Sequence, residues 1–155
     1  MVIRKFTRAD EDTYLALAAA FYQDGDAVDH VVPAHHAQRT FAALMEGTPY
    51  ADALLAEDED GTPLGFVLLA LTWSNEAGGL TVWIEELFVH DRARGRGVGR
   101  ALMDAVRAAY PEAARFRLEV TADNVRAMRM YRARGYVPLA YDQMILDFPP
   151  PKPQE

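Results

Sequence analysis

The spacing of apolar and polar positions divides the first half of the chain into three short strands and two helices. Residues 2–6 alternate and are rich in β-branched and aromatic side chains, which predicts a strand. Residues 7–22 and 33–45 place apolar side chains at helical spacing, and a proline opens the second of these segments. Residues 51–58 and 64–73 are apolar runs on either side of the turn-forming sequence EDGTP, which predicts a β-hairpin.

The second half of the chain alternates between strand and helix. The pattern predicts strands at 80–89 and 115–120, helices at 97–109 and 123–135, and two final strands at 136–140 and 141–148. A strand, a helix and a strand in succession require a parallel crossover, whereas a hairpin requires antiparallel pairing. We therefore expect one α+β domain with a mixed sheet over residues 1–148, followed by a disordered proline-rich tail at 149–155.

Composition and charge narrow the class of protein. The 155 residues carry a net charge of −7 and include no cysteine, which excludes disulfides, thiolate zinc sites and a cysteine nucleophile. An acidic chain is not typical of proteins that bind nucleic acid through its phosphates. The N-terminus lacks the pattern of a secretory signal, and no run of 18 apolar residues is present to span a membrane. We expect a cytoplasmic protein without a nucleic-acid or membrane partner.

One segment departs from this acidic background. Residues 94–100 read RGRGVGR and lie between a predicted strand and a predicted helix. The three glycines let backbone N–H groups approach an anion, and the dipole of the following helix concentrates positive potential at the same point. The three arginines add charge there. The segment predicts a phosphate-binding turn, although it matches neither the Walker A sequence nor the dinucleotide-binding GxGxxG fingerprint.

Two segments of the chain together resemble a known family. The first is Arg94-Gly95-Arg96-Gly97-Val98-Gly99, after a predicted strand and before an apolar helix. The second follows the next predicted strand and carries Asn124, Ala127, Tyr131, Gly135 and Tyr136. In order and spacing they resemble the two signatures of the GCN5-related N-acetyltransferase (GNAT) superfamily. The signatures cover about residues 80–137, and the flanking elements follow the order of that family.

The resemblance implies a GNAT-like α+β fold, with a mixed, mostly antiparallel central sheet, a splayed pair of parallel strands and about four flanking helices. It also implies acetyl-coenzyme A (acetyl-CoA) as a co-substrate and implies no metal. The pyrophosphate is expected at the glycine-rich turn and the pantetheine arm along the edge of strand 80–89. The implied cofactor-binding residues are Leu87, Phe88, Val89, Arg94, Gly95, Arg96, Gly97, Val98, Gly99, Arg100, Asn124, Ala127 and Tyr131.

Acetyl transfer to an amine needs a base for the ammonium proton and an acid for the departing thiolate. The resemblance implies Tyr131 as the acid, since a phenol is protonated at neutral pH. Glu85 and Glu86 are the candidate bases, because carboxylates within an apolar strand are costly unless they have a partner or a role. By analogy with polyamine-type acetyltransferases, Glu85 ranks first, Glu86 second and Glu119 third. A structural salt bridge is the competing interpretation for the first two.

Strand parity bears on the choice between these two glutamates. Strict alternation places Glu85 on the face of Leu87, and Glu86 on the face of Ile84 and Phe88. A β-bulge, which is common in the family, shifts this parity, so the pattern leaves the choice open.

The acid-rich stretch at 22–30 favours a cationic acceptor. The residues expected to line the acceptor site are Tyr22, His30 and Glu119. The hypothesis is an N-acetyltransferase that moves an acetyl group from acetyl-CoA to a small cationic or lysine-like primary amine by direct attack in a ternary complex. The alternative is a non-catalytic CoA-binding sensor or regulatory module. The apolar segment 141–148 suits a homodimer, whose existence the sequence leaves open.

Overall fold

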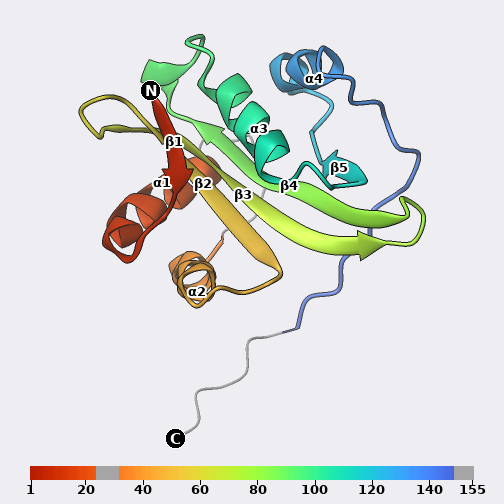
Figure 1. The fold of residues 1–155 in the computed structure, drawn as a ribbon, viewed down its shortest axis with the longest axis horizontal. Helices are drawn as coiled ribbons and strands as arrows, with labels where there is room; N and C mark the ends of the chain where they lie inside the picture. The colour runs from red at the N-terminus through yellow and green to blue at the C-terminus, as the bar shows by residue number, and fades with distance from the viewer. Residues whose placement is uncertain (24–31, 149–155) are drawn as a thin grey trace, which may run out of the picture.

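The computed structural model describes residues 1–23 and 32–148, and its elements surround a single sheet (Figure 1). In chain order they are β1 (Val2–Lys5), the 3-10 helix η1 (Arg8–Asp10), α1 (Glu11–Gln23), α2 (Ala34–Met45), β2 (Ala51–Glu57), β3 (Pro63–Ser74), β4 (Gly79–Val89), the 3-10 helix η2 (Asp91–Ala93), α3 (Val98–Ala109), β5 (Arg115–Leu118) and α4 (Val125–Arg132). The elements predicted up to residue 135 are confirmed to within a few residues at their ends. The proline-rich tail predicted at 149–155 lies outside the described residues.

The sheet is mixed, as predicted. Its strands follow the order β1-β2-β3-β4-β5, with antiparallel pairing from β1 to β4 and parallel pairing between β4 and β5. Short turns join β2 to β3 and β3 to β4, whereas α3 makes the crossover that parallel pairing requires. The fold is therefore α+β with a mostly antiparallel sheet, in agreement with the prediction.

Two apolar clusters cover the two faces of the sheet. On one face, α3 packs Val98, Leu102 and Val106 against β-strand residues that include Val82 and Ile84, and we call this the α3 face. On the other face, which we call the α1–α2 face, helices α1 and α2 contribute the buried residues Tyr14, Leu17 and Phe41, which pack on Phe66 and Phe88. Figure 1 shows α3 and the α1–α2 pair on opposite sides of the strands. Both faces of β4 are thus within reach of helices.

Helix α4 joins the α3 face through a small number of contacts. Tyr131 is buried in the cluster of that face, and Arg134 Nη2 lies 2.7 Å from Asp104 Oδ1 on α3. The Asn124 side chain accepts a hydrogen bond from the Ala127 N–H at 3.0 Å and so caps the helix. Gly135, whose φ is +87°, ends the segment, as the sequence predicts.

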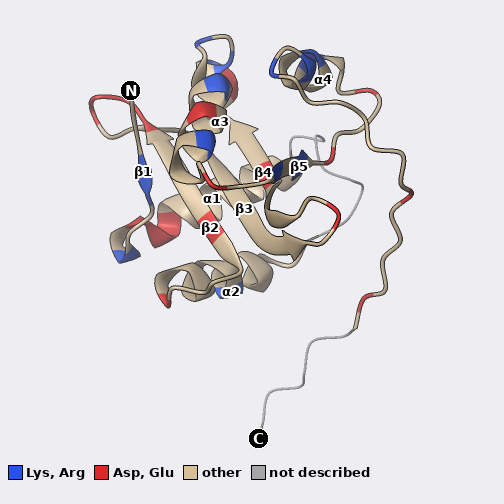
Figure 2. Ribbon diagram, turned by 45° about the vertical axis from the view of Figure 1, so that its right-hand side comes forward, with Lys and Arg blue, Asp and Glu red and all other residues tan. Residues whose placement is uncertain are grey.

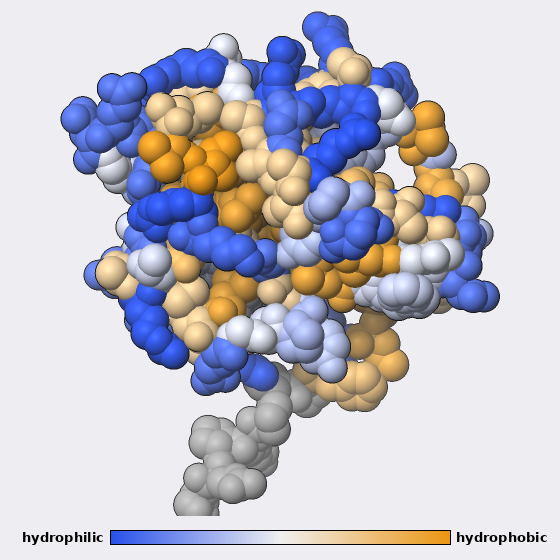
Figure 3. Space-filling view, in the orientation of Figure 1, coloured by the Kyte–Doolittle hydropathy of each residue, from blue (hydrophilic) through white to orange (hydrophobic). Residues whose placement is uncertain are grey.

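The two final strands predicted at 136–140 and 141–148 are wrong, because these residues join no backbone ladder. Apolar alternation shows that a segment suits a sheet, but a strand forms only where a neighbouring backbone pairs with it. The nearest edge strand, β5, is four residues long, and Pro138 has no N–H to offer. Figure 3 shows apolar surface at the lower right, where the segment leaves the body. Its exposed apolar residues are Val137, Leu139, Tyr141, Met144, Ile145, Leu146 and Phe148.

Within residues 1–23 and 32–148, none of the helices has the length and apolar character needed to cross a bilayer.

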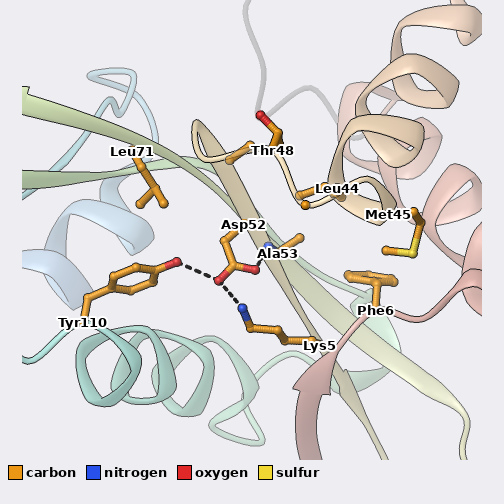
Figure 4. Close-up of a pocket in the computed structure, with 11 residues that line it drawn as sticks. Lys5, Phe6, Leu44, Met45, Thr48, Asp52, Ala53, Leu71 and Tyr110 are labelled. Atoms are coloured by element: carbon orange, nitrogen blue, oxygen red, sulfur yellow. Dashed lines mark hydrogen bonds and ion pairs between the residues drawn. The ribbon is translucent and has the colours of Figure 1, made fainter.

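A hollow of about 300 Å³ lies where the start of β2 meets the ends of α2 and α3 (Figure 4). Inside it, Asp52 Oδ2 accepts hydrogen bonds from Lys5 Nζ at 2.9 Å and from the Tyr110 hydroxyl at 2.6 Å. The other carboxylate oxygen accepts a hydrogen bond from the Ala53 N–H at 2.9 Å. Since both oxygens are engaged, we interpret this network as structural, joining the end of α3 to the sheet.

Tyr110→Phe is expected to lower the free energy of unfolding by about 1 kcal/mol, because the half-buried Asp52 carboxylate loses one of its donors. Tyr50→Phe is the matched control, since the Tyr50 side chain is 74% exposed. Denaturant unfolding of both variants measures the difference. Equal free energies of unfolding for the two variants would contradict a structural role for the network.

Candidate active site

The C-terminal half of β4 has a sheet partner on one side only. Pairing with β5 ends at Ile84 and Leu118, whereas β4 continues to Val89. Pairing with β3 on the other side continues to the end of β4. Glu119, which was predicted to lie within the strand, falls just beyond the end of β5. The edge of β4 that faces away from β3 is therefore open over its last five residues.

Backbone groups of β4 point to this open edge at alternate residues. The His90 N–H donates to the Leu64 carbonyl on β3 at 2.9 Å, so the backbone groups of Val89 and Leu87 face the opposite, open edge. The Val89 carbonyl accepts a hydrogen bond from Arg94 Nε at 3.2 Å. The Leu87 backbone groups and the Val89 N–H therefore offer a short strand-like template for an extended ligand that carries amide groups.

A β-bulge interrupts β4 where the pairing with β5 ends. The register between β3 and β4 skips Glu85, which is an extra residue on β4. Ile84 and Leu87, on either side of the two glutamates, both pack in the cluster of the α3 face. Glu85 and Glu86 consequently both point to the α1–α2 face. Strict alternation, which would separate them, is wrong here, and the bulge is the reason.

Glu86 is the more buried of the two glutamates, with 8% of its surface exposed. Its Oε1 accepts a hydrogen bond from the Tyr22 hydroxyl on α1 at 2.5 Å. Its Oε2 is buried and has no hydrogen-bond partner among the described residues. Burial raises the pKa of Glu86 to about 7, although the Tyr22 hydrogen bond opposes the shift; the charge of Glu85 adds to it. A carboxyl with this pKa is able to exchange a proton near neutral pH.

Two tyrosines from α1 surround this carboxylate. Burial raises the pKa of both Tyr14 and Tyr22 above the usual phenol value, and the negative charge of Glu86 adds to both shifts. Both hydroxyls therefore stay protonated at neutral pH. Tyr22 was expected at the acceptor site and does lie at this carboxylate. Tyr14 was not among the residues that the sequence singled out.

Glu85 is more exposed than Glu86 and lies near a third carboxylate. Partial burial raises the pKa of Glu85, and the charge of Glu119, at the end of β5, raises it further. The end of the β4–β5 ladder thus brings together the three carboxylates that the sequence singled out. Their mutual repulsion favours a positively charged neighbour at this position.

The glycine-rich turn leads directly into α3. Gly95 and Gly97 have φ values of +80° and +83°, and a side chain at either position would meet no atom within 4 Å. The first helical hydrogen bond runs from the Ala101 N–H to the Gly97 carbonyl at 2.9 Å. The N–H groups of Val98, Gly99 and Arg100 precede it and have no acceptor among the described residues. The turn therefore ends, at a helix N-terminus, in three N–H groups without an acceptor in the described part of the protein.

The arginines of this segment divide into two roles. Arg94 holds the turn together, because its Nη1 lies 2.7 Å from Asp91 Oδ1 while its Nε contacts β4. Arg96 and Arg100 are exposed beside the open N–H groups. Figure 2 shows basic residues on this turn and on α4. The local potential at the start of α3 is consequently positive.

The residues of the second signature lie on the α3 face. Tyr131 is 8% exposed, and its ring centroid lies 5.7 Å from that of Tyr136. Ala127 packs against the same cluster, while the Asn124 side chain serves as the helix cap described above. Tyr131 and Glu86 therefore approach β4 from opposite faces of the sheet.

Part of the predicted acceptor site belongs to residues 24–31. His30 and the acidic residues of the stretch at 24–29 lie outside the described residues. In the part of the chain that the structure does describe, no group of three or more histidines, aspartates and glutamates is arranged to hold a metal ion.

The comparison with protein families decides how this arrangement is interpreted. Residues 11–136 match the acetyltransferase (GNAT) family, which is most of the chain. The chain belongs to the GNAT acetyltransferase family. The family resemblance predicted from the two signatures is thereby confirmed, together with the α+β fold class. No curated protein matches this chain by sequence.

Solved structures with the same fold are numerous. An integron cassette protein from the mobile metagenome of Cole Harbour Salt Marsh is 25% identical, with a TM-score of 0.76 over 96% of this chain and 91% of that one. A ribosomal-protein-alanine N-acetyltransferase from Brucella melitensis biovar Abortus 2308 is 19% identical, with a TM-score of 0.72 over 96% and 100%. An aminoglycoside N-acetyltransferase in complex with CoA is 16% identical, with a TM-score of 0.73 over 96% and 94%.

The raised pKa of Glu86 makes stability depend on pH. Between pH 4.5 and about 7 the unfolded chain releases this proton before the folded protein does, so the Glu86 contribution to stability falls as pH rises. Glu86→Gln is therefore expected to gain stability relative to wild type across this interval, by up to about 3 kcal/mol.

Denaturant unfolding at several pH values from 4 to 8 measures this difference. Glu59→Gln, at an exposed position, is the control and is expected to show a much smaller change. A constant difference between Glu86→Gln and wild type across the whole range would contradict the raised pKa.

Proposed function

We propose that this protein transfers an acetyl group from acetyl-CoA to a primary amine by direct attack in a ternary complex. When bound, acetyl-CoA supplies an acetyl group activated as a thioester. The observation that carries the proposal is Glu86, a buried carboxylate with one unpartnered oxygen and a pKa of about 7, beside the open half of β4. The membership of this chain in the GNAT family supports acetyl transfer as the class of reaction.

The residues around the start of α3 fit the cofactor expected for this family. The N–H groups of residues 98–100 and the exposed Arg96 and Arg100 suit a diphosphate, since donors at a helix N-terminus attract anions. Gly95 and Gly97 leave the approach to these donors clear of side chains. The open edge at Leu87–Val89 suits the amide-containing pantetheine arm. Aminoglycoside acetyltransferase structures that contain CoA or a CoA-based bisubstrate analogue share the fold and support this assignment.

Glu86 is the proposed general base. It takes a proton from the acceptor ammonium at Oε2, while Tyr22 holds Oε1 in place with a hydrogen bond. A base whose pKa lies near the working pH is efficient, because it is largely ionised and still accepts a proton. Glu85 ranked first from the sequence; its greater exposure instead favours a role in attracting the cationic acceptor together with Glu119.

Tyr131 is the proposed acid. Its place in the second signature supports this role, as does its position on the face of β4 opposite Glu86. With base and acid on opposite faces, Glu86 would take a proton from the ammonium on one side of β4. On the other side, Tyr131 would give a proton to the thiolate that departs as the N–C bond forms and the C–S bond breaks. The open edge between them is where the acetyl group would lie.

The acceptor is expected to be a positively charged amine before it reacts. Three carboxylates at the end of the β4–β5 ladder favour an ammonium group. Two neighbours of this fold are named for amine acceptors, an aminoglycoside in one case and a ribosomal-protein alanine in the other. A small cationic amine or a lysine-like amine remains the proposed class.

Gly97→Glu is expected to lower the affinity for CoA by roughly 10-fold to 100-fold or more, because it places a carboxylate against a diphosphate. Gly61→Glu is the matched control: Gly61 also has a positive φ, +76°, and open space around it, but lies in the turn between β2 and β3. Calorimetric titration with CoA measures the affinity of both variants. The same affinity in the two variants would remove the turn from the cofactor site.

Glu86→Gln is expected to lower kcat by about 10²-fold or more and to abolish the pH dependence of kcat/KM near pH 7, because the base is lost. Glu85→Gln, on the same face, is expected to raise KM for the amine and to change kcat by less than about 10-fold. A thiol-release assay over a pH series separates the two. Full activity in Glu86→Gln would exclude it as the base, while CoA binding without turnover of any amine would favour the non-catalytic alternative.

A further inference from the structure

A stacked pair of side chains lies on the same face of the sheet as the carboxylates. Trp83 on β4 and Arg117 on β5 are opposite each other in the parallel ladder, and Arg117 Cζ lies 4.0 Å from the centroid of the Trp83 ring. Their neighbours Ile84 and Leu118 pack on the α3 face. Because side chains alternate along a strand, Trp83 and Arg117 point to the α1–α2 face.

Arg117 has no carboxylate partner within ion-pair distance in the described part of the chain. This distinguishes it from Arg115, two residues earlier on the same strand and face, whose Nη2 lies 3.2 Å from Glu76 Oε1. Arg117 is half-buried, and the contact with Trp83 replaces only part of the hydration that its guanidinium loses, since no anion lies beside it among the described residues. The contact with the indole holds the guanidinium in place and leaves N–H groups available, because the ring accepts none of them in a conventional hydrogen bond.

The position of Arg117 relative to the carboxylates sets a length scale. Trp83 precedes Glu85 by two positions on β4, and Arg117 precedes Glu119 by two positions on β5. At about 3.3 Å per residue, each pair of Cα atoms is separated by roughly 7 Å. Arg117 and the carboxylate residues thus lie on one face of the sheet with Cα separations that the two ends of one small molecule can span.

We infer that Arg117, held over the Trp83 ring, binds an oxyanion carried by the acceptor, a carboxylate or a phosphate, while the ammonium group of the same molecule lies at the carboxylates. The guanidinium edge matches either oxyanion with two parallel hydrogen bonds. The inference rests on the proposed function and narrows its acceptor class. The preferred acceptors are zwitterionic amines with the two charges a few bonds apart, rather than amines with positive charge only.

The test compares matched acceptors on the purified full chain. 5-Aminopentanoate is paired with pentylamine, and O-phosphoethanolamine with ethanolamine, so that carboxylate and phosphate are examined separately. Wild type is expected to show a kcat/KM roughly 10-fold to 100-fold higher for the member of at least one pair that carries the oxyanion. Arg117→Gln is expected to abolish that preference through KM, with kcat for the simple amine and the affinity for CoA unchanged.

Two further variants serve as controls for Arg117→Gln. Arg115→Gln, on the same face, is expected to retain the preference for the oxyanion. Arg117→Lys keeps the charge but not the two-pronged geometry and is expected to retain only part of it. Thermal unfolding of each variant accompanies the kinetics.

The outcomes separate this inference from the proposed function. Acetylation of simple amines with no preference for the oxyanion, or a preference that survives in Arg117→Gln, would overturn the inference and leave the acetyltransferase proposal intact. If no amine is turned over, the proposed function fails. Calorimetric binding of the zwitterionic acceptors then decides the role of Arg117: loss of binding in Arg117→Gln supports it, and unchanged or absent binding overturns it.

Discussion

The end of the parallel ladder between β4 and β5 is the constraint on which the rest of the site depends. Pairing stops at Ile84 and Leu118, and the next residue of β4, Glu85, is a β-bulge. The bulge turns two successive carboxylates to one face, while the missing partner leaves the backbone edge of β4 open. If the two strands paired to the end of β4, the backbone edge would be filled. Without the bulge against β3, the two glutamates would point to opposite faces.

Charge separates the two ends of this open edge. The start of α3 offers unpaired N–H groups and exposed arginines, whereas the bulge offers three carboxylates. An elongated molecule with an anionic end would therefore bind along this edge in one direction only. This separation of charge is local. The chain as a whole has a net charge of −7, and the basic turn is an exception to it. The orientation of a bound ligand would therefore depend on where α3 begins and where the β4–β5 ladder ends.

The sequence predicted the parts of the site that depend on local residue types. The glycine-rich turn needs positive φ at Gly95 and Gly97, and no other residue type adopts that conformation as easily. The bulge depends on the register with β3, and the contact between Tyr22 and Glu86 joins residues 64 positions apart, so neither is readable from a local pattern. The two final strands failed for the same reason, because apolar alternation cannot supply a pairing partner.

Amide hydrogen exchange, with and without CoA, tests the central claim most directly. The account predicts slower exchange on CoA binding at two separate places, the backbone of Leu87 to Val89 and the N–H groups from Gly95 to Arg100. Their joint protection would identify the open edge and the helix start as one continuous binding surface. Exchange that is unchanged at both places when CoA is bound, or protection confined to another part of the sheet, would contradict the account.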